Sequence, residues 1–258
     1  MYTLWRTGHP INEEVTKAFR IGSLKLSRGD GFVVKDTAYL EHEKHAVPSV
    51  AYGILRGTDR VFKWCESENK EWWEIDRGYF GAHHYSGYYR ISLRNTRAKF
   101  TPIELPRTRC RFIFEPYKTG RHILLCPPTA PVSEFFELPD NWVELKTAEI
   151  RKYSDRPIIV RHKDSARDLA WDLENAHCVV TYNSNTAIDA LIRGIPAFSE
   201  SPDVMGWLGG GVELIEQPFN YERDTLFTFL SHCQFTLEEF KTGFAWMHAQ
   251  AVQKYGCL

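Results

Sequence analysis

The 258-residue sequence lacks the patterns that mark membrane and secreted proteins. It has no run of about 18 apolar residues, so we expect no membrane-spanning helix and no membrane partner. The N-terminal residues Met1–Arg6 contain no basic segment followed by an apolar stretch, so no secretory signal is expected. Both absences favour a soluble, cytoplasmic protein.

The common nucleotide and metal motifs are also missing. There is no G-x-G-x-x-G and no G-x-x-x-x-G-K-[ST], which argues against dinucleotide oxidoreductases and P-loop kinases. No Asp-x-Asp pair is present, the pattern that anchors a catalytic divalent metal in one major transferase fold, so no bound metal is expected. The six cysteines form no C-x-x-C pair and several lie in apolar runs, which favours buried thiols over disulfides or zinc ligands.

Charge is balanced overall but unevenly distributed. The net charge is -1, which by itself does not indicate a nucleic-acid partner. Between Gly81 and His122, however, nine basic residues stand against two acids, Glu104 and Glu115. The basic residues are Arg90, Arg94, Arg97, Lys99, Arg107, Arg109, Arg111, Lys118 and Arg121. Such a segment is typical of a polyanion-binding surface and equally of the solvated face of a phosphate-binding cleft.

Short β-branched or aromatic runs alternate with helix-patterned segments along the chain. The expected strands are Tyr2–Trp5, Gly31–Lys35, Ser49–Gly53, Trp72–Ile75, Tyr88–Leu93, Cys110–Phe114, His122–Leu125, Pro157–Val160, Cys178–Tyr182 and Ile195–Phe198. The expected helices are Asn12–Arg20, Thr58–Asn69, Trp142–Lys152, Asp168–Asn175 and Asn185–Arg193. This alternation indicates an α/β fold built on parallel, doubly wound sheets.

Three prolines in the polar stretch Phe100–Lys118 indicate a boundary between two lobes, 1–115 and 116–258. A last helix is predicted to begin at Thr236, with Glu239 completing a capping box. Its apolar residues share one helical face, which predicts that the helix packs back on the core; they are Leu237, Phe240, Phe244 and Met247.

The strongest candidate site lies in the block Cys178–Phe198. An apolar strand ends near Thr181, four small polar residues follow, and a helix then runs to Gly194; the four are Asn183, Ser184, Asn185 and Thr186. Ligands of parallel sheets bind beyond the carboxyl ends of the strands, where helix N-termini present free N–H groups. The block therefore predicts an anion site, whereas a plain helix cap would explain only Ser184 or Asn185 alone.

A cationic triplet, Arg161-His162-Lys163, follows the expected strand Pro157–Val160. It would lie along the same sheet edge as Ser184, where such side chains neutralise a diphosphate leaving group. The alternative is a solvated loop.

The third candidate is Asp76, which the strand Trp72–Ile75 would deliver to its carboxyl end, with Gly78 permitting a tight departure. A carboxylate there could deprotonate an attacking hydroxyl, with His83 and His84 as rival bases. The alternative is an Asp that caps a turn, with the aromatic residues filling a gap. The residues expected to guide an acceptor are Tyr85, Tyr88, Tyr89, Arg90, Arg94 and Arg97, whose rings would stack on a sugar or base.

Several segments resemble a group of phage and bacterial proteins described as glycosyltransferase-like. They are Glu74–Phe80, Gly87–Ser92, Arg156–Lys163, Cys178–Phe198 and Cys233–Trp246. The Thr-Ala-x-Asp-Ala-Leu-x-x-Gly-x-Pro element from Thr186 to Pro196 is also similar to the nucleotide-sugar lobe of capsule-type sugar transferases of GT-B architecture.

The resemblance implies two facing Rossmann-like lobes and a metal-independent sugar transfer, without a cofactor, from a nucleotide-sugar, expected to be a UDP-sugar. The donor would be held by Arg161, His162, Lys163, Asn183, Ser184, Asn185 and Thr186. Phage members of such groups modify DNA, so the favoured acceptor is a hydroxymethylated pyrimidine in double-stranded DNA, within the host cytoplasm. A base in a duplex would have to be flipped out of the stack. The alternatives are a cell-surface polysaccharide acceptor, or a non-catalytic nucleotide-sugar- or DNA-binding module.

Overall fold

The computed structural model describes residues 2–26, 32–42, 48–80, 87–100, 103–110, 112–203, 211–217 and 222–256. The chain divides into two compact units. The first unit comprises Met1–Arg109 and Phe227–Leu258, and the second comprises Cys110–Leu226. This differs from the expected lobes 1–115 and 116–258, because the last segment of the chain belongs to the first unit rather than the second.

The first unit is built on a six-stranded sheet in the order β10-β5-β4-β3-β1-β2. Its strands are β1 (Tyr2–Arg6), β2 (Phe32–Asp36), β3 (Ser49–Tyr52), β4 (Trp72–Arg77), β5 (Tyr89–Leu93) and β10 (Gln234–Phe235). β2, β1, β3 and β4 are parallel, whereas β5 and β10 are antiparallel additions at one edge. The sequence predicted the first five strands but not β10, which is only two residues long.

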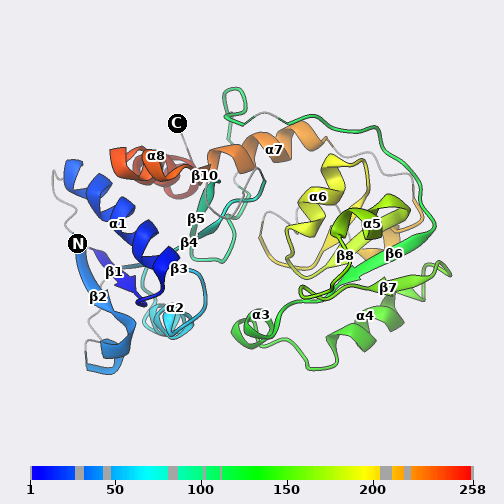
Figure 1. Ribbon diagram of the computed structural model, residues 1–258, viewed down its shortest axis with the longest axis horizontal. Coiled ribbons are helices and arrows are strands. Elements are labelled where there is room, and N and C mark those ends of the chain that lie inside the picture. Colours follow the sequence, from blue (N-terminus) through cyan, green and yellow to red (C-terminus); the bar gives the residue numbers. More distant parts are fainter. Residues whose placement is uncertain are drawn as a thin grey trace. The chain divides into compact units, whose positions relative to one another are not determined.

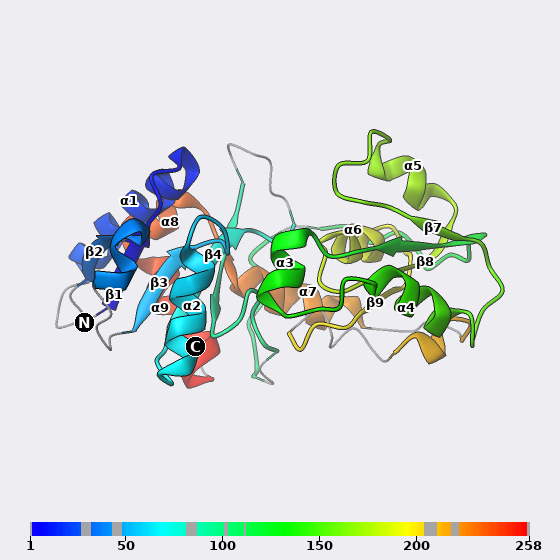
Figure 2. The same cartoon turned by 90° about the horizontal axis from the view of Figure 1, so that it is seen from below.

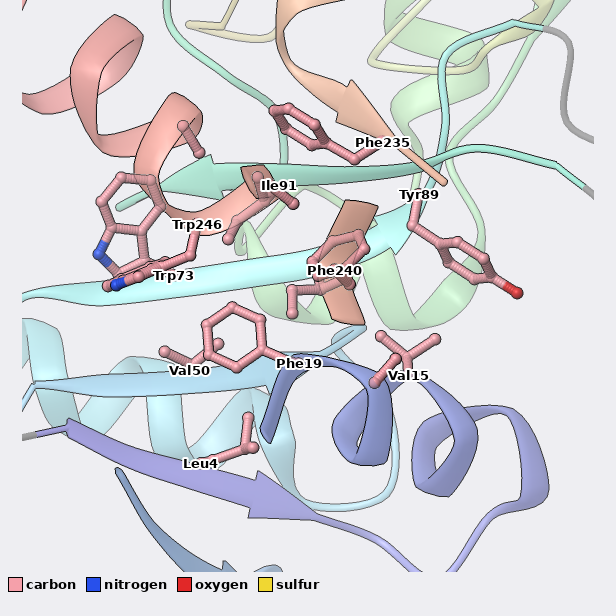
Figure 3. Packing of buried hydrophobic residues seen from close by; sticks show 14 of the residues in the cluster. Leu4, Val15, Phe19, Val50, Trp73, Tyr89, Ile91, Phe235, Phe240 and Trp246 are labelled. Carbon is pink, nitrogen blue, oxygen red and sulfur yellow. The ribbon is translucent and has the colours of Figure 1, made fainter. Parts of the chain in front are cut away.

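Helices cover both faces of this sheet. α1 (Pro10–Lys25) packs against α8 (Leu237–Thr242) and α9 (Phe244–Gln250). α2 (Thr58–Ser67) packs against β3 and β4, where Phe62 stacks on Trp72 with 4.4 Å between the ring centroids. The main core lies under α1, where Phe19, Trp73 and Trp246 meet edge to face (Figure 3). The apolar strand residues on this face thus form one core with residues of α1, α8 and α9.

The expected C-terminal helix is two helices. Thr236 and Glu239 form the predicted capping box at the start of α8. Gly243, with φ +85°, ends α8 in the left-handed conformation that favours glycine, and α9 then starts in a new direction. Phe240 is buried, but Met247 is 51% exposed, because the break rotates α9 so that Ala245, Trp246 and Ala249 face inward instead.

The second unit is built on a four-stranded, all-parallel sheet in the order β7-β6-β8-β9. Its strands are β6 (His122–Cys126), β7 (Ile158–Val160), β8 (Ala176–Thr181) and β9 (Ala197–Ser199). Its helices are α3 (Ala130–Phe135), α4 (Trp142–Ile150), α5 (Leu169–Glu174) and α6 (Thr186–Ile192). α4 lies on one side of the strands, and α5 and α6 lie on the other (Figure 1). The chain returns to the first unit within α7 (Arg223–His232), which Figure 2 labels. The remaining described elements are two 3₁₀ helices, Thr37–His42 and Val212–Leu214, and a π-helix, Ala251–Tyr255.

The expected strand Cys110–Phe114 is wrong. Its described residues, 110 and 112–114, form no strand. Ile113 is 88% exposed, and an apolar β-branched sequence without a neighbouring strand has no ladder of hydrogen bonds to join.

Both units are therefore of the α/β class, with the helix–strand alternation that the sequence predicted. The four parallel strands of each unit have the same order relative to the chain, β2-β1-β3-β4 and β7-β6-β8-β9. No helix among the described residues is long and apolar enough to cross a bilayer. The five described cysteines are free and buried, as expected; the sixth, Cys257, lies outside the described residues.

Candidate functional site

The second unit has a topological switch point between β6 and β8. The chain leaves β6 towards β7 through α4, and leaves β8 towards β9 through α6 on the other side of the sheet (Figure 1). Connections that leave neighbouring strands on opposite faces open a crevice at the carboxyl ends of those strands, which is where doubly wound folds bind ligands. Both segments singled out in the sequence, Arg161–Lys163 and Asn183–Thr186, lie at this carboxyl edge.

Hydroxyl groups tie the two strand ends together. Thr181 Oγ1 donates to the Cys126 carbonyl at 2.8 Å and accepts from Ser184 N at 3.2 Å. Ser184 Oγ accepts from Thr186 N at 3.2 Å and donates to Thr186 Oγ1 at 3.0 Å. This network fixes the loop after β8, so part of the polar cluster shapes the crevice rather than waiting for a ligand.

The helix that follows the loop is short. α6 has seven residues, and Asn185 occupies its N-cap position without a side-chain cap hydrogen bond. Asn183 is buried, and Ser184, Asn185 and Thr186 are half-buried. The helix ends at Ile192, two residues before the predicted Gly194. At Gly194 φ is +68°, and a Cβ would lie 2.0 Å from the Pro116 carbonyl oxygen. Glycine is therefore required by space as well as by conformation.

The cationic triplet divides into one internal and two exposed side chains. Arg161 forms an ion pair with Asp172 and donates to the Arg167 carbonyl at 2.8 Å. Its side chain is 13% exposed and that of Asp172 only 6%, so Arg161 ties the end of β7 to α5 rather than presenting its charge to a ligand. This corrects the direct phosphate contact expected for it. His162 and Lys163 are exposed at the same edge.

Cys126 ends β6 beside Thr186 and Arg161. Burial raises the pKa of its thiol to about 11, against the smaller opposing effects of a hydrogen bond to Thr186 and of the Arg161 charge. The group is therefore a neutral thiol near pH 7, and it is poorly suited to act as a nucleophile.

Asp76 lies at the carboxyl end of β4 in the first unit, as predicted, and it is held there by hydrogen bonds. Its Oδ2 accepts from Arg90 Nη2 at 2.7 Å and its Oδ1 accepts from Arg77 N at 2.8 Å. The Asp76 side chain is 33% exposed, whereas that of Arg90 is 5% exposed and lies 3.7 Å from Glu74, which is 1% exposed. Asp76 is therefore accessible, but one partner of a largely buried ion-pair cluster.

The expected acceptor-binding residues divide between the surface and the interior. Arg90 is buried and donates through Nε to the Thr96 carbonyl at 2.9 Å; Tyr89 belongs to the main core, and Arg97 is 7% exposed. These three side chains are part of the structure of the unit, which corrects their assignment to an acceptor surface. Tyr88 is half-buried and Arg94 is exposed, whereas His83, His84 and Tyr85 lie outside the described residues.

Gly78 permits the tight departure from β4, but for a reason of space rather than conformation. A Cβ there would lie 2.8 Å from Tyr88 Cβ and 2.9 Å from Gln234 Oε1. Gln234 accepts from Tyr79 N at 2.8 Å and donates to the Phe80 carbonyl at 3.1 Å. The short strand β10, missed in the sequence, thus holds the segment that follows Asp76.

The basic segment is not a continuous charged surface. Besides Arg90 and Arg97, Arg109 is internal: it pairs with Glu239, donates to the Gln234 carbonyl at 3.0 Å, and lies over the ring of Phe235 at 4.8 Å. Arg90 and Arg109 therefore pair with groups of the first unit, and Arg97 is buried, although the sequence placed all three in one electrostatic footprint.

A surface hollow of about 570 Å³ lies in the second unit, lined by Arg151, Lys152, Tyr153, Ser154, Asp155, Arg156 and Glu216. Residues 151–156 of its lining directly precede β7, so it lies at the opposite end of that strand from Lys163. Arg156 and Ser154 both bind the Glu216 carboxylate, with distances of 2.9 Å and 2.6 Å. Because these polar groups hydrogen-bond one another, the hollow is a weaker candidate for a binding site than the switch point.

Sequence comparisons add little to this geometry. No family model matches the chain, and no curated protein matches it. Among solved structures it is similar to KpsC of Thermosulfurimonas dismutans, described as a beta Kdo 2,7 transferase. The identity is 11%, the TM-score is 0.44, and the match covers 95% of this chain and 99% of that chain.

Proposed function

We propose that the chain is a glycosyltransferase that moves a sugar from a nucleotide-sugar, a UDP-sugar in the first instance, to a hydroxyl acceptor. The observation that carries the proposal is the switch-point crevice of the second unit. The hydroxyl-rich loop after β8 and the exposed His162 and Lys163 after β7 lie at the same carboxyl edge of the sheet, on either side of β6. Such an edge suits a diphosphate, because it offers backbone N–H groups, hydroxyls and positive charge together.

In this proposal Lys163 and His162 neutralise the charge that develops on the diphosphate as the sugar leaves, without a bound metal. Ser184, Asn185 and Thr186 contact the phosphates from the loop, and Asn183 supports the loop from below. Arg161 acts as a positioning residue through Asp172, since its guanidinium is engaged there. Asp76 is the proposed general base that accepts the proton of the attacking hydroxyl.

The burial of three arginines bears on the acceptor. A DNA duplex binds through many exposed cations that neutralise phosphates, and Arg90, Arg97 and Arg109 are not exposed for that purpose. We therefore favour a glycan hydroxyl over a hydroxymethylated pyrimidine in phage DNA. The remaining candidate is a non-catalytic module that binds a nucleotide-sugar without turnover.

The donor site is tested by calorimetric titration of UDP and UDP-glucose into the full chain. Lys163→Ala is expected to weaken binding about tenfold, as for loss of a charge-assisted hydrogen bond. Lys152→Ala is the matched control, because it removes the same charge from an exposed residue before β7. Equal affinities for the two variants, or no nucleotide binding by the wild type, would contradict the donor assignment.

The acceptor is tested by mass spectrometry after incubation with UDP-sugars and either hydroxymethylated DNA or a panel of oligosaccharides. A mass increase on an oligosaccharide supports the proposal. A glucosylated nucleoside would instead restore the DNA acceptor. Nucleotide binding without transfer to either would favour the binding module.

A further inference from the structure

The first unit has a switch point of its own. β1 lies between β2 and β3, and the connection from β1 runs through α1 whereas that from β3 runs through α2. The carboxyl ends of β1 and β3 therefore border a crevice of the same kind as that between β6 and β8. The connection after β1, residues Thr7–His9, precedes the sixteen-residue helix α1.

Two polar atoms beneath this connection have no hydrogen-bond partner. Asn12 is 2% exposed, and its Oδ1 accepts from Thr7 N at 3.0 Å, which places the whole carboxamide against the connection. Asn12 Nδ2 and Thr7 Oγ1 are both buried without a hydrogen bond in the described part of the chain. Folded proteins rarely leave such groups unsatisfied, so each is a candidate to hydrogen-bond a water molecule or a ligand.

The neighbouring side chains at this edge offer both donors and acceptors. Tyr52 ends β3, and burial followed by the charge of Asp76 raises the pKa of its phenol, which shows that the two groups lie close. Burial and the charge of Glu14, in α1, raise the pKa of Tyr89. The Tyr89 hydroxyl points away from the apolar cluster (Figure 3). Phenols, carboxylates and a carboxamide thus gather around the ends of β1 and β3.

This composition disfavours an anion. Glu13 Oε1 already accepts from Gly8 N at 3.1 Å, and Glu14 and Asp76 add negative charge nearby. A sugar hydroxyl, in contrast, both donates and accepts, and it can satisfy a carboxamide N–H and a threonine hydroxyl at once.

We propose that the carboxyl edge between β1 and β3 is a sugar-binding subsite, in which Thr7 Oγ1 and Asn12 Nδ2 hydrogen-bond a hydroxyl of a neutral, polyhydroxylated ligand. The identification of this sugar as the acceptor of a transfer reaction rests on the proposed function, whereas sugar binding itself does not.

The probes are the methyl β-glycosides of glucose, galactose and mannose, titrated into the full chain without nucleotide and followed by saturation-transfer NMR. At least one is expected to bind. Thr7→Val keeps the shape of the side chain and removes its hydroxyl, so it should weaken that binding about five- to tenfold. Because the hydroxyl has no partner in the free protein, the melting temperature should stay the same or rise.

Thr37→Val is the matched control, since the Thr37 hydroxyl donates to the Arg56 carbonyl at 3.1 Å. It should lower the melting temperature and leave glycoside affinity unchanged. Asn12→Asp replaces Nδ2 by oxygen and should also weaken binding. The subsite is wrong if no glycoside binds, or if Thr7→Val lowers the melting temperature and leaves affinity intact. UDP binding without glycoside binding would support the donor assignment and contradict only this subsite. Glycoside binding without UDP binding would support the subsite and contradict the donor assignment.

Discussion

The two units share a strand order and differ in what their carboxyl edges carry. In each, a first strand lies between the second and the third, so each sheet has a switch point by topology alone. The edge of the second unit carries exposed basic residues and a hydroxyl-rich loop. That of the first carries tyrosines, carboxylates and the Asn12 carboxamide, whose Nδ2 has no hydrogen-bond partner among the described residues. Under the two proposals above, the same backbone order would bind an anion in one unit and a polyol in the other.

The units also differ in how they use arginine. In the first, Arg90 lies between Glu74 and Asp76 and is nearly inaccessible. In the second, Arg161 pairs with Asp172 beside exposed cations. Buried charge in the first unit therefore links β4 to the antiparallel strand β5, whereas His162 and Lys163 of the second unit are exposed to solvent.

The largest effect is expected from Arg90→Met, which leaves Glu74 buried without its cation. Removing one partner of a buried ion pair destabilises a protein by about 3–5 kcal/mol. Urea denaturation should show this loss, while Arg94→Ala, at an exposed residue, should change stability by no more than about 0.5 kcal/mol. If Arg90→Met is as stable as wild type and loses acceptor binding instead, Arg90 binds the acceptor and does not stabilise the unit as an ion-pair partner.

Asp76→Asn tests the catalytic side of the comparison. If Asp76 accepts the proton of the acceptor, its amide variant should lower the transfer rate by about 10²–10⁴-fold. Nucleotide affinity, which the proposal assigns to the second unit, should not change. Asp36→Asn is the control, since Asp36 also ends a strand of the same sheet and pairs with Arg6 at 3.8 Å. Unchanged transfer by Asp76→Asn would exclude this base.

Acid should weaken the first unit through a pair of histidines. His232 Nδ1 and His248 Nε2 lie 2.9 Å apart, and burial lowers the pKa of both, that of His248 to about 4, with Arg109 adding to the effect. A base with a lower pKa in the folded state binds fewer protons when folded, so stability is present near pH 7 and is lost as the pH falls from about 6.5 towards 4.

Hydrogen exchange should therefore show residues 237–250 losing protection before the strands of the second unit in this range. His248→Phe should flatten the pH dependence, because it removes the group whose pKa is shifted most. Equal loss of protection in both units would contradict the role of this pair.

The smallest expected effects compare one helix cap in each unit. Thr236 Oγ1 accepts from Glu239 N at 3.3 Å in α8, and Asp168 Oδ1 accepts from Ala170 N at 2.8 Å in α5. Replacing either residue by Ala should cost about 1 kcal/mol of unfolding free energy. A much larger loss for Thr236→Ala would show that the capping box also secures β10, which immediately precedes it.

Local patterns allowed most of the fold to be predicted. Alternating apolar runs located nine of the ten strands in the described part of the chain, because strand and helix periodicities depend on neighbouring residues. The same strand–helix alternation placed Ser184 and Lys163 at one sheet edge. It overlooked Thr7 and Asn12, although Thr7-Gly8-His9 also lies between a strand and a helix, because that stretch carries no conspicuous run of polar residues.

What the sequence by itself determined is the α/β class, the strand–helix order and the edge at which candidate residues would lie, since all three follow from periodicity and from the geometry of parallel strands. Only the tertiary structure decided which charges are available. In the sequence, three arginines were expected to contact a ligand, but in the structure each pairs with a carboxylate: Arg90 with Asp76, Arg109 with Glu239 and Arg161 with Asp172. These partners lie 14, 130 and 11 residues away in the chain, each in another element of the same unit. Burial and pairing of a charge depend on such contacts between elements rather than on local pattern.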